Sequence, residues 1–132
     1  MRLLLDTNIV SDLMRHPHGL AAAQLAAVGE SAVCTSVIVA VELRYGAAKK
    51  GSVRLTAQLE LVLGALNILP FEPPADRSYG WIRSALETKG QLIGGNDMLI
   101  AAQALSLGYA VVTDKEAEFS RIDGLQVLNW LR

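Results

Sequence analysis

Short runs of consecutive apolar residues alternate along the chain with longer segments in which apolar residues recur every three or four positions. The first run, Leu3–Leu5, is wholly apolar, as is typical of a parallel strand that is buried on both faces. Four later runs also predict strands, at residues 32–35, 68–71, 110–113 and 126–128. The chain therefore contains five candidate strands, all of them short.

The segments between these runs predict helices. After Asp6, apolar residues continue at helical spacing to Met14, and the His-Pro-His-Gly sequence at 16–19 ends that segment. Further helices are expected at residues 20–28, 36–45, 55–66, 73–89 and 96–107. Gly46 is expected to end the helix that begins at Ser36, and Asn96 to cap the last helix. Strands that alternate with helices predict an α/β fold, a three-layer domain with a central parallel β-sheet flanked by helices.

Length and composition change this picture only slightly. The 132 residues suit a single domain over residues 1–132, with no linker or internal repeat. The chain is 52% hydrophobic and 19% charged, which is more apolar than an average soluble domain. The apolar surplus has two explanations that remain open: an interface for a partner, or a helix-rich core of Ala, Leu and Val.

Charge and cysteine content exclude several classes of protein. The formal net charge of −1 argues against a DNA-coating protein, but it allows an enzyme that engages phosphates through local cations and a metal ion. The single cysteine, Cys34, excludes an intramolecular disulfide and a cysteine-based zinc site. The first apolar run is too short for a signal peptide, and no stretch reaches the roughly 18 apolar residues of a membrane span. A cytoplasmic protein without a membrane segment is expected.

Four acidic residues fall where α/β proteins form active sites, at the carboxyl ends of parallel strands. Asp6 directly follows the first predicted strand, and Asp114 directly follows the fourth. Asp97 begins a helix behind a Gly-Gly loop, and Glu42 lies in the helix after the second strand. If the sheet is wound in the usual right-handed sense, these four side chains face one cavity.

Each of these acids also has a simpler interpretation. Asp6 and Asp97 are suited to helix capping, and Asp114 to a turn. Glu42 is harder to explain in this way, because its neighbours are apolar nearly all round the helix. A carboxylate buried there requires a cation or a strong donor, and pairing with Arg44 is the structural alternative.

Carboxylates that converge without another nucleophile favour divalent-metal chemistry. Mg²⁺ and Mn²⁺ prefer hard oxygen ligands, and a bound ion activates water and neutralises charge on a phosphodiester. Several short polar residues are suited to orient the carboxylates, or to serve only as caps and turns: Thr7, Asn8, Ser36, Asn96 and Thr113. Other chemistries fit less well, since the chain has no phosphate-binding Gly-rich loop and no serine in a nucleophile elbow.

At these positions the chain resembles the PIN-domain family and, within it, the VapC toxins. Leu-Asp-Thr-Asn at 5–8 is similar to the opening motif of the family, and Ser36 with Val-Glu-Leu-Arg-Tyr-Gly at 41–46 is similar to the second. Gly-Asn-Asp at 95–97 resembles the third motif, and Val-Thr-Asp at 112–114 begins the closing segment. The likeness covers nearly the whole chain, with the motifs in the family's order.

The resemblance implies an endoribonuclease that uses Mg²⁺ or Mn²⁺ and leaves a 5′-phosphate and a 3′-hydroxyl. By position, Asp6, Glu42 and Asp97 match the metal-binding acids of the family. Asp6 and Asp97 are expected to bind the ion directly, and Glu42 and Asp114 through water or by positioning the nucleophile. In some relatives the fourth polar residue falls one place later, where this chain has Lys115. In this chain Asp114 is expected to be the fourth acid, and Glu118 is the alternative.

The resemblance also implies a bacterial toxin that is inhibited by a cognate antitoxin and forms a homodimer or a larger toxin–antitoxin assembly. The antitoxin groove is expected beside the helices at 37–45 and 55–66. A basic group suited to steer the RNA backbone, or simply a solvated helix end, comprises Arg44, Lys49, Lys50 and Arg54. Two other functions remain possible. One is a PIN-like binding module that does not cut RNA. The other is a nuclease that cuts DNA flaps, although such enzymes usually carry extra DNA-binding segments and this chain has no insertion of that kind.

Overall fold

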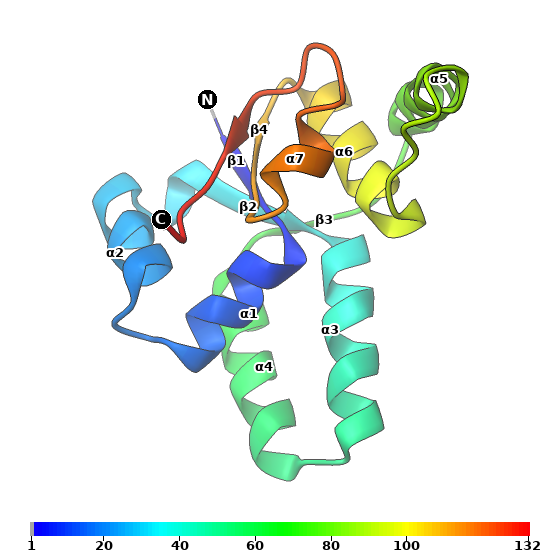
Figure 1. The fold of residues 1–132 in the computed structure, drawn as a ribbon. Coiled ribbons are helices and arrows are strands. Elements are labelled where there is room, and N and C mark those ends of the chain that lie inside the picture. The colour runs from blue at the N-terminus through cyan, green and yellow to red at the C-terminus, as the bar shows by residue number, and fades with distance from the viewer. Residues whose placement is uncertain (1) are drawn as a thin grey trace.

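A five-stranded, entirely parallel sheet lies between helices in the computed structural model, which describes residues 2–132 (Figure 1). The strands are β1 (Leu3–Leu5), β2 (Val33–Ser36), β3 (Ile68–Leu69), β4 (Ala110–Val112) and β5 (Val127–Leu128). They are ordered β3-β2-β1-β4-β5 across the sheet. The α/β class and the parallel sheet that the sequence predicts are confirmed.

Seven α-helices and one short 3₁₀ helix connect the strands. They are α1 (Thr7–Arg15), α2 (Leu20–Val28), η1 (Glu30–Ala32), α3 (Val37–Lys50), α4 (Val53–Ala65), α5 (Ala75–Thr88), α6 (Gly95–Leu107) and α7 (Glu116–Phe119). In Figure 1, α3 and α4 form a hairpin that extends away from the sheet, while α5 and α6 lie together at its other side. No helix within residues 2–132 has the length and apolar character that crossing a bilayer would need.

The order of the strands reverses between β1 and β4. From β1 the chain moves outward to β2 and β3, and then crosses back to place β4 on the opposite side of β1. Connections on the two sides diverge at such a point, which leaves a crevice beyond the carboxyl ends of the two strands. Leu5 is in register with Val112, and the Asp6 N–H donates to the Val112 carbonyl over 2.9 Å. The residues that follow β1 and β4 are therefore held side by side.

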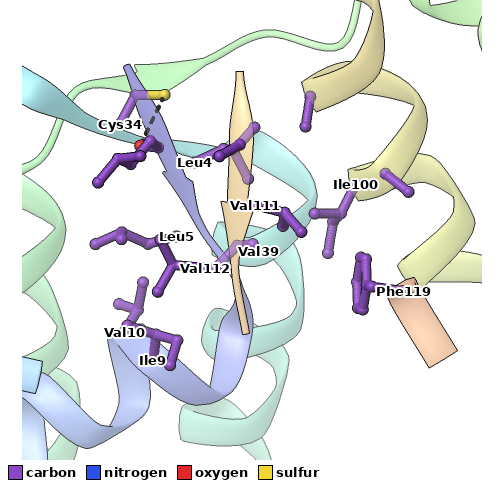
Figure 2. Packing of buried hydrophobic residues seen from close by; sticks show 14 of the residues in the cluster. Leu4, Leu5, Ile9, Val10, Cys34, Val39, Ile100, Val111, Val112 and Phe119 are labelled. Atoms are coloured by element: carbon purple, nitrogen blue, oxygen red, sulfur yellow. Dashed lines mark hydrogen bonds between the residues drawn. The ribbon is translucent and has the colours of Figure 1, made fainter. Parts of the chain in front are cut away.

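The core lies against both faces of β1 and β4. The side chains of Leu4, Leu5, Val111 and Val112 are fully buried, as a central parallel pair requires. Figure 2 shows Ile100 of α6 beside Val111, with Phe119 of α7 close by and Ile9 and Val10 of α1 gathered near Leu5. The packing of these residues fixes the helices around the carboxyl edge of the sheet.

Two predicted helix boundaries are wrong. Gly46 lies inside α3, which continues to Lys50 and ends at Gly51, where φ is +65°. One internal glycine costs only about 1 kcal/mol, and the helix is held by tertiary packing on both sides of it. Asn96 is not a cap, because α6 begins at Gly95 after an N-cap at Gly94 and leaves Asn96 exposed in its first turn. Helix α7 was not predicted, since four residues are too few to show a period.

Candidate active site

Asp6 is held rigidly at the carboxyl end of β1. Its side chain is 1% exposed; Oδ1 accepts from the Thr7 backbone N–H over 2.7 Å, and Oδ2 accepts from Thr113 Oγ1 over 2.7 Å. Burial raises the pKa of Asp6, the hydrogen bonds from Thr113 and Thr7 partly oppose that effect, and the charge of Asp97 raises the pKa further. Asp6 therefore caps α1, as the simpler interpretation predicts. It is also a buried carboxyl group whose ionisation is disfavoured by its surroundings.

The raised pKa of Asp6 makes a prediction about stability. A carboxyl with a higher pKa in the folded state stabilises the fold below its unfolded pKa, and this contribution is lost as the pH rises through the folded pKa. In EDTA, Asp6→Asn is therefore expected to increase the free energy of unfolding at pH 7. The gain should shrink as the pH falls towards the ordinary value of 3.8.

Urea unfolding across this pH range measures the effect. The exposed carboxylate Asp123 provides a matched control, since Asp123→Asn removes a charge that is not buried. A stability gain from Asp6→Asn that is constant with pH, or larger in acid, would contradict the prediction.

Asp97 lies in the first turn of α6, where the positive end of the helix dipole favours a carboxylate. Its side chain is buried, and its two oxygens lie 3.4 and 3.3 Å from Lys115 Nζ. A Cβ added at Gly94 would come within 3.3 Å of Asp97 Oδ2. The glycine therefore leaves open the space beside one oxygen of this carboxylate.

Glu42 reaches the same region from α3. The side chain is half-buried, and Oε1 accepts from Thr7 Oγ1 over 2.8 Å. The expectation of a carboxylate buried on an apolar helix is wrong, because the neighbouring Val41 and Tyr45 are 57% and 67% exposed. The alternative partner is not found either. Arg44 does not pair with Glu42 but with Glu60 of α4, because α4 packs alongside α3.

The fourth predicted acid lies beside the site. Asp114 follows β4 by two residues and is exposed, and its Oδ1 accepts from Asn8 Nδ2 over 2.9 Å. Asn8 is two residues after Asp6, so this bond links the ends of β1 and β4. Glu118 is half-buried on α7. The choice of Asp114 over Glu118 remains a prediction.

Lys115 joins the acids, and the sequence interpretation gave it no role. Burial is the largest influence on its pKa and lowers it, but attraction by Asp97, Asp6 and Glu42 outweighs burial and leaves the pKa raised. One ammonium group thus lies within electrostatic reach of all three acids that were predicted to bind metal. The signal in the sequence is a lysine immediately after Asp114, the acid that follows β4.

Some of the remaining predicted residues contact the acids and others lie away from them. The residues in contact are Thr7, Asn8 and Thr113. Ser36 is buried and acts as the N-cap of α3, accepting from the Ile38 N–H over 3.0 Å. The structure places the predicted basic group elsewhere, along the outer part of the α3–α4 hairpin: Arg44, Lys49, Lys50 and Arg54, all exposed.

The donor set suits a hard divalent cation. Within residues 2–132, no three Asp, Glu, His or Cys side chains come close enough to enclose a metal ion. Mg²⁺ does not require such a cage, because it keeps several waters and commonly binds one or two carboxylates. The charge of Asp97 raises the pKa of Asp6, and Gly94 leaves space at Asp97. Hard oxygen donors in excess over the single ammonium therefore fit Mg²⁺ or Mn²⁺.

A parallel α/β sheet with buried carboxylates at its switch point places the chain in the class of α/β proteins that carry an acidic site at the carboxyl edge of the sheet. Within that class, the chain belongs to the PIN-domain family, which matches residues 3–125.

Known proteins that resemble this chain over most of its length are ribonucleases and endonucleases of the VapC type. The chain is 36% identical to Ribonuclease VapC2 of Rickettsia felis over 132 residues, covering 98% of each protein. It is 38% identical over 101 residues to the tRNA(fMet)-specific endonuclease VapC of Salmonella typhimurium, covering 76% of each. A crystal structure of VapBC2 from Rickettsia felis, bound to a promoter DNA fragment, contains a chain that superposes with a TM-score of 0.90 and 32% identity, covering 98% of this chain and 99% of that one. These relatives are VapC-type members of the family.

Proposed function

We propose that this protein is a metal-dependent endoribonuclease toxin that a cognate antitoxin neutralises. The observation that carries the proposal is the pair of buried carboxylates at the switch point between β1 and β4: Asp6, held by Thr7 and Thr113, and Asp97, 3.3 Å from Lys115. The relatives named as ribonucleases or endonucleases support the same chemistry, since they match this chain at 36% and 38% identity.

In the proposed site, Asp6 and Asp97 hold the divalent ion. The bound ion supplies a Lewis acid that activates water and offsets the charge that develops on the RNA phosphodiester. Thr7 and Thr113 keep the carboxylates in place through the bonds to Glu42 and Asp6. One Glu42 oxygen accepts a hydrogen bond from the Thr7 hydroxyl. The other oxygen is therefore available to accept a proton from the attacking water. Asp114, bound by Asn8, helps to orient that water.

We also propose that the antitoxin covers exposed apolar surface near the α3–α4 hairpin. Val41 and Tyr45 project from α3, and Leu61 projects from α4. An apolar groove of about 280 Å³ lies between α1, α2 and α4, and is lined by Leu13, Pro17, Ala22, Leu25, Glu30, Leu61, Val62, Ala65 and Leu66. The groove borders α4 but not α3, so it adjoins one of the two helices beside which the antitoxin is expected. The VapBC2 complex of Rickettsia felis, which is bound to a fragment of promoter DNA, supports a toxin–antitoxin assembly that binds DNA.

Cleavage assays on paired substrates test the proposed activity. We expect labelled RNA to be cut in Mg²⁺ or Mn²⁺, with 5′-phosphate products. EDTA should lower the rate by about 10²-fold or more, because the ion supplies both the activated water and the charge compensation, and added Mn²⁺ should restore it.

The same assay separates the alternatives. Cleavage that persists in EDTA would contradict the metal mechanism. Preferential cutting of a DNA flap over RNA would identify a structure-specific DNA nuclease. Binding of RNA without cleavage, under conditions in which Mn²⁺ binds the protein, would identify a binding module.

A further inference from the structure

The acid site contains a cation of its own. Lys115 Nζ faces both oxygens of Asp97, at 3.3 and 3.4 Å, and the two side chains are 38% and 12% exposed. The charges of Asp6 and Glu42 act on the same ammonium group. Lys115 thus places a positive charge where an ion held by Asp6 and Asp97 would place another.

The main chain of Lys115 is fixed, whereas its ammonium group can move. The Lys115 N–H donates to Thr113 Oγ1 over 3.0 Å, and this hydroxyl in turn donates to Asp6. The next residues form α7, which is anchored by the fully buried Phe119. The side chain, in contrast, has a flexible four-carbon stem and reaches solvent. The ammonium can therefore leave Asp97 without any change in the backbone.

A divalent ion and an ammonium cannot share one carboxylate without strong repulsion, since the site is partly withdrawn from water. Binding of the ion must therefore break the Lys115–Asp97 pair, and the loss of that pair reduces the net affinity. Before the ion binds, the ammonium offsets part of the negative charge of Asp97, Asp6 and Glu42. The same group thus stabilises the empty site and opposes its filling.

We propose that Lys115 and the divalent ion occupy the Asp97 carboxylate in alternation, so that Lys115 sets the metal concentration at which the site fills. This inference rests on the proposed function, because it takes Asp6 and Asp97 as the metal ligands. It adds a residue that competes with the ion, one place after Asp114, the expected fourth acid.

Calorimetric titration with Mn²⁺ alone, without RNA or antitoxin, tests the inference on the full-length protein. Lys115→Met keeps most of the aliphatic stem and removes the charge. We expect its Kd for Mn²⁺ to be about three- to tenfold lower than that of the wild type, the scale of a partly exposed ion pair. Thermal unfolding provides a second readout, in which Mn²⁺ should raise the Tm of Lys115→Met more than that of the wild type.

Three further variants make the result specific. Lys115→Arg retains the charge and should bind Mn²⁺ no more tightly than the wild type. Lys89→Met is the matched control, because Lys89 pairs with Asp123 over 3.8 Å and not with an acid of the site. Asp97→Asn should abolish the binding heat, which assigns that heat to this site.

The possible outcomes distinguish the two proposals. If the wild type binds Mn²⁺ and Lys115→Met binds it equally or less tightly, the competition is overturned while the metal site stands. If neither protein binds Mn²⁺ at millimolar concentrations, the metal site itself is wrong, and the role of Lys115 is overturned with it.

Discussion

Asp6→Asn is expected to lower the rate of RNA cleavage by about 10²- to 10³-fold, the scale seen when a preorganised charge-stabilising group is removed. Asparagine retains one acceptor oxygen, which can keep the bond to the Thr7 N–H. It loses the negative charge that would hold the ion beside Asp97. The substitution thus removes the charge needed to hold the ion while keeping the shape of the site.

Single-turnover cleavage at saturating Mn²⁺ measures this loss. Asp12→Asn is a suitable control, because Asp12 lies on the same helix, α1, and its carboxylate faces His16 at 3.9 Å. Asp12→Asn should cleave within about twofold of the wild type, because Asp12 is not one of the acids of the candidate site. An Asp6→Asn variant that is folded, binds Mn²⁺ and retains wild-type cleavage would refute the assignment of Asp6.

Phe119→Ala should lower the free energy of unfolding by about 3–5 kcal/mol, as is typical when a buried phenylalanine is truncated. Phe119 is fully buried and is the residue that attaches α7 to the core. A loss of this size is a large fraction of the about 5–15 kcal/mol that stabilises an ordinary domain. Urea unfolding in EDTA gives the value directly.

Phe119→Leu provides the comparison. It keeps much of the apolar volume, so its cost should be clearly smaller than that of Phe119→Ala. Equal losses from the two variants, or a loss below about 1 kcal/mol for Phe119→Ala, would show that α7 is not held by this side chain.

The sequence predicts the centre of this molecule better than its periphery. β1 and β4 are recognisable because both faces of each are covered, which makes them uninterrupted apolar runs. Asp6 and Asp114 could be placed at one edge of the sheet because each follows such a run. β3 and β5 are only two residues long and half-buried, so their pattern indicated position but not extent.

Contacts between distant segments were not predictable in the same way. For Glu42 the sequence offered a bound cation or, as the alternative, its near neighbour Arg44, and it gave no sign of the donor that the structure shows, Thr7, 35 residues away. Lys115 meets Asp97 only because α6 and β4 are packed together, and no local pattern reports that contact. Gly46 failed as a helix terminus because tertiary packing outweighs the intrinsic preference of one residue.

The bond between Thr113 and Asp6 spans 107 positions of the chain, and this separation has a consequence for synthesis. A nascent chain that has not yet released β4 from the ribosome lacks the hydroxyl, the adjoining lysine and the neighbouring strand on which Asp6 depends. Contacts this far apart form late, because a long loop must close first. A site assembled in this way cannot form before β4 has been synthesised, so a chain that stops short of Thr113 lacks it.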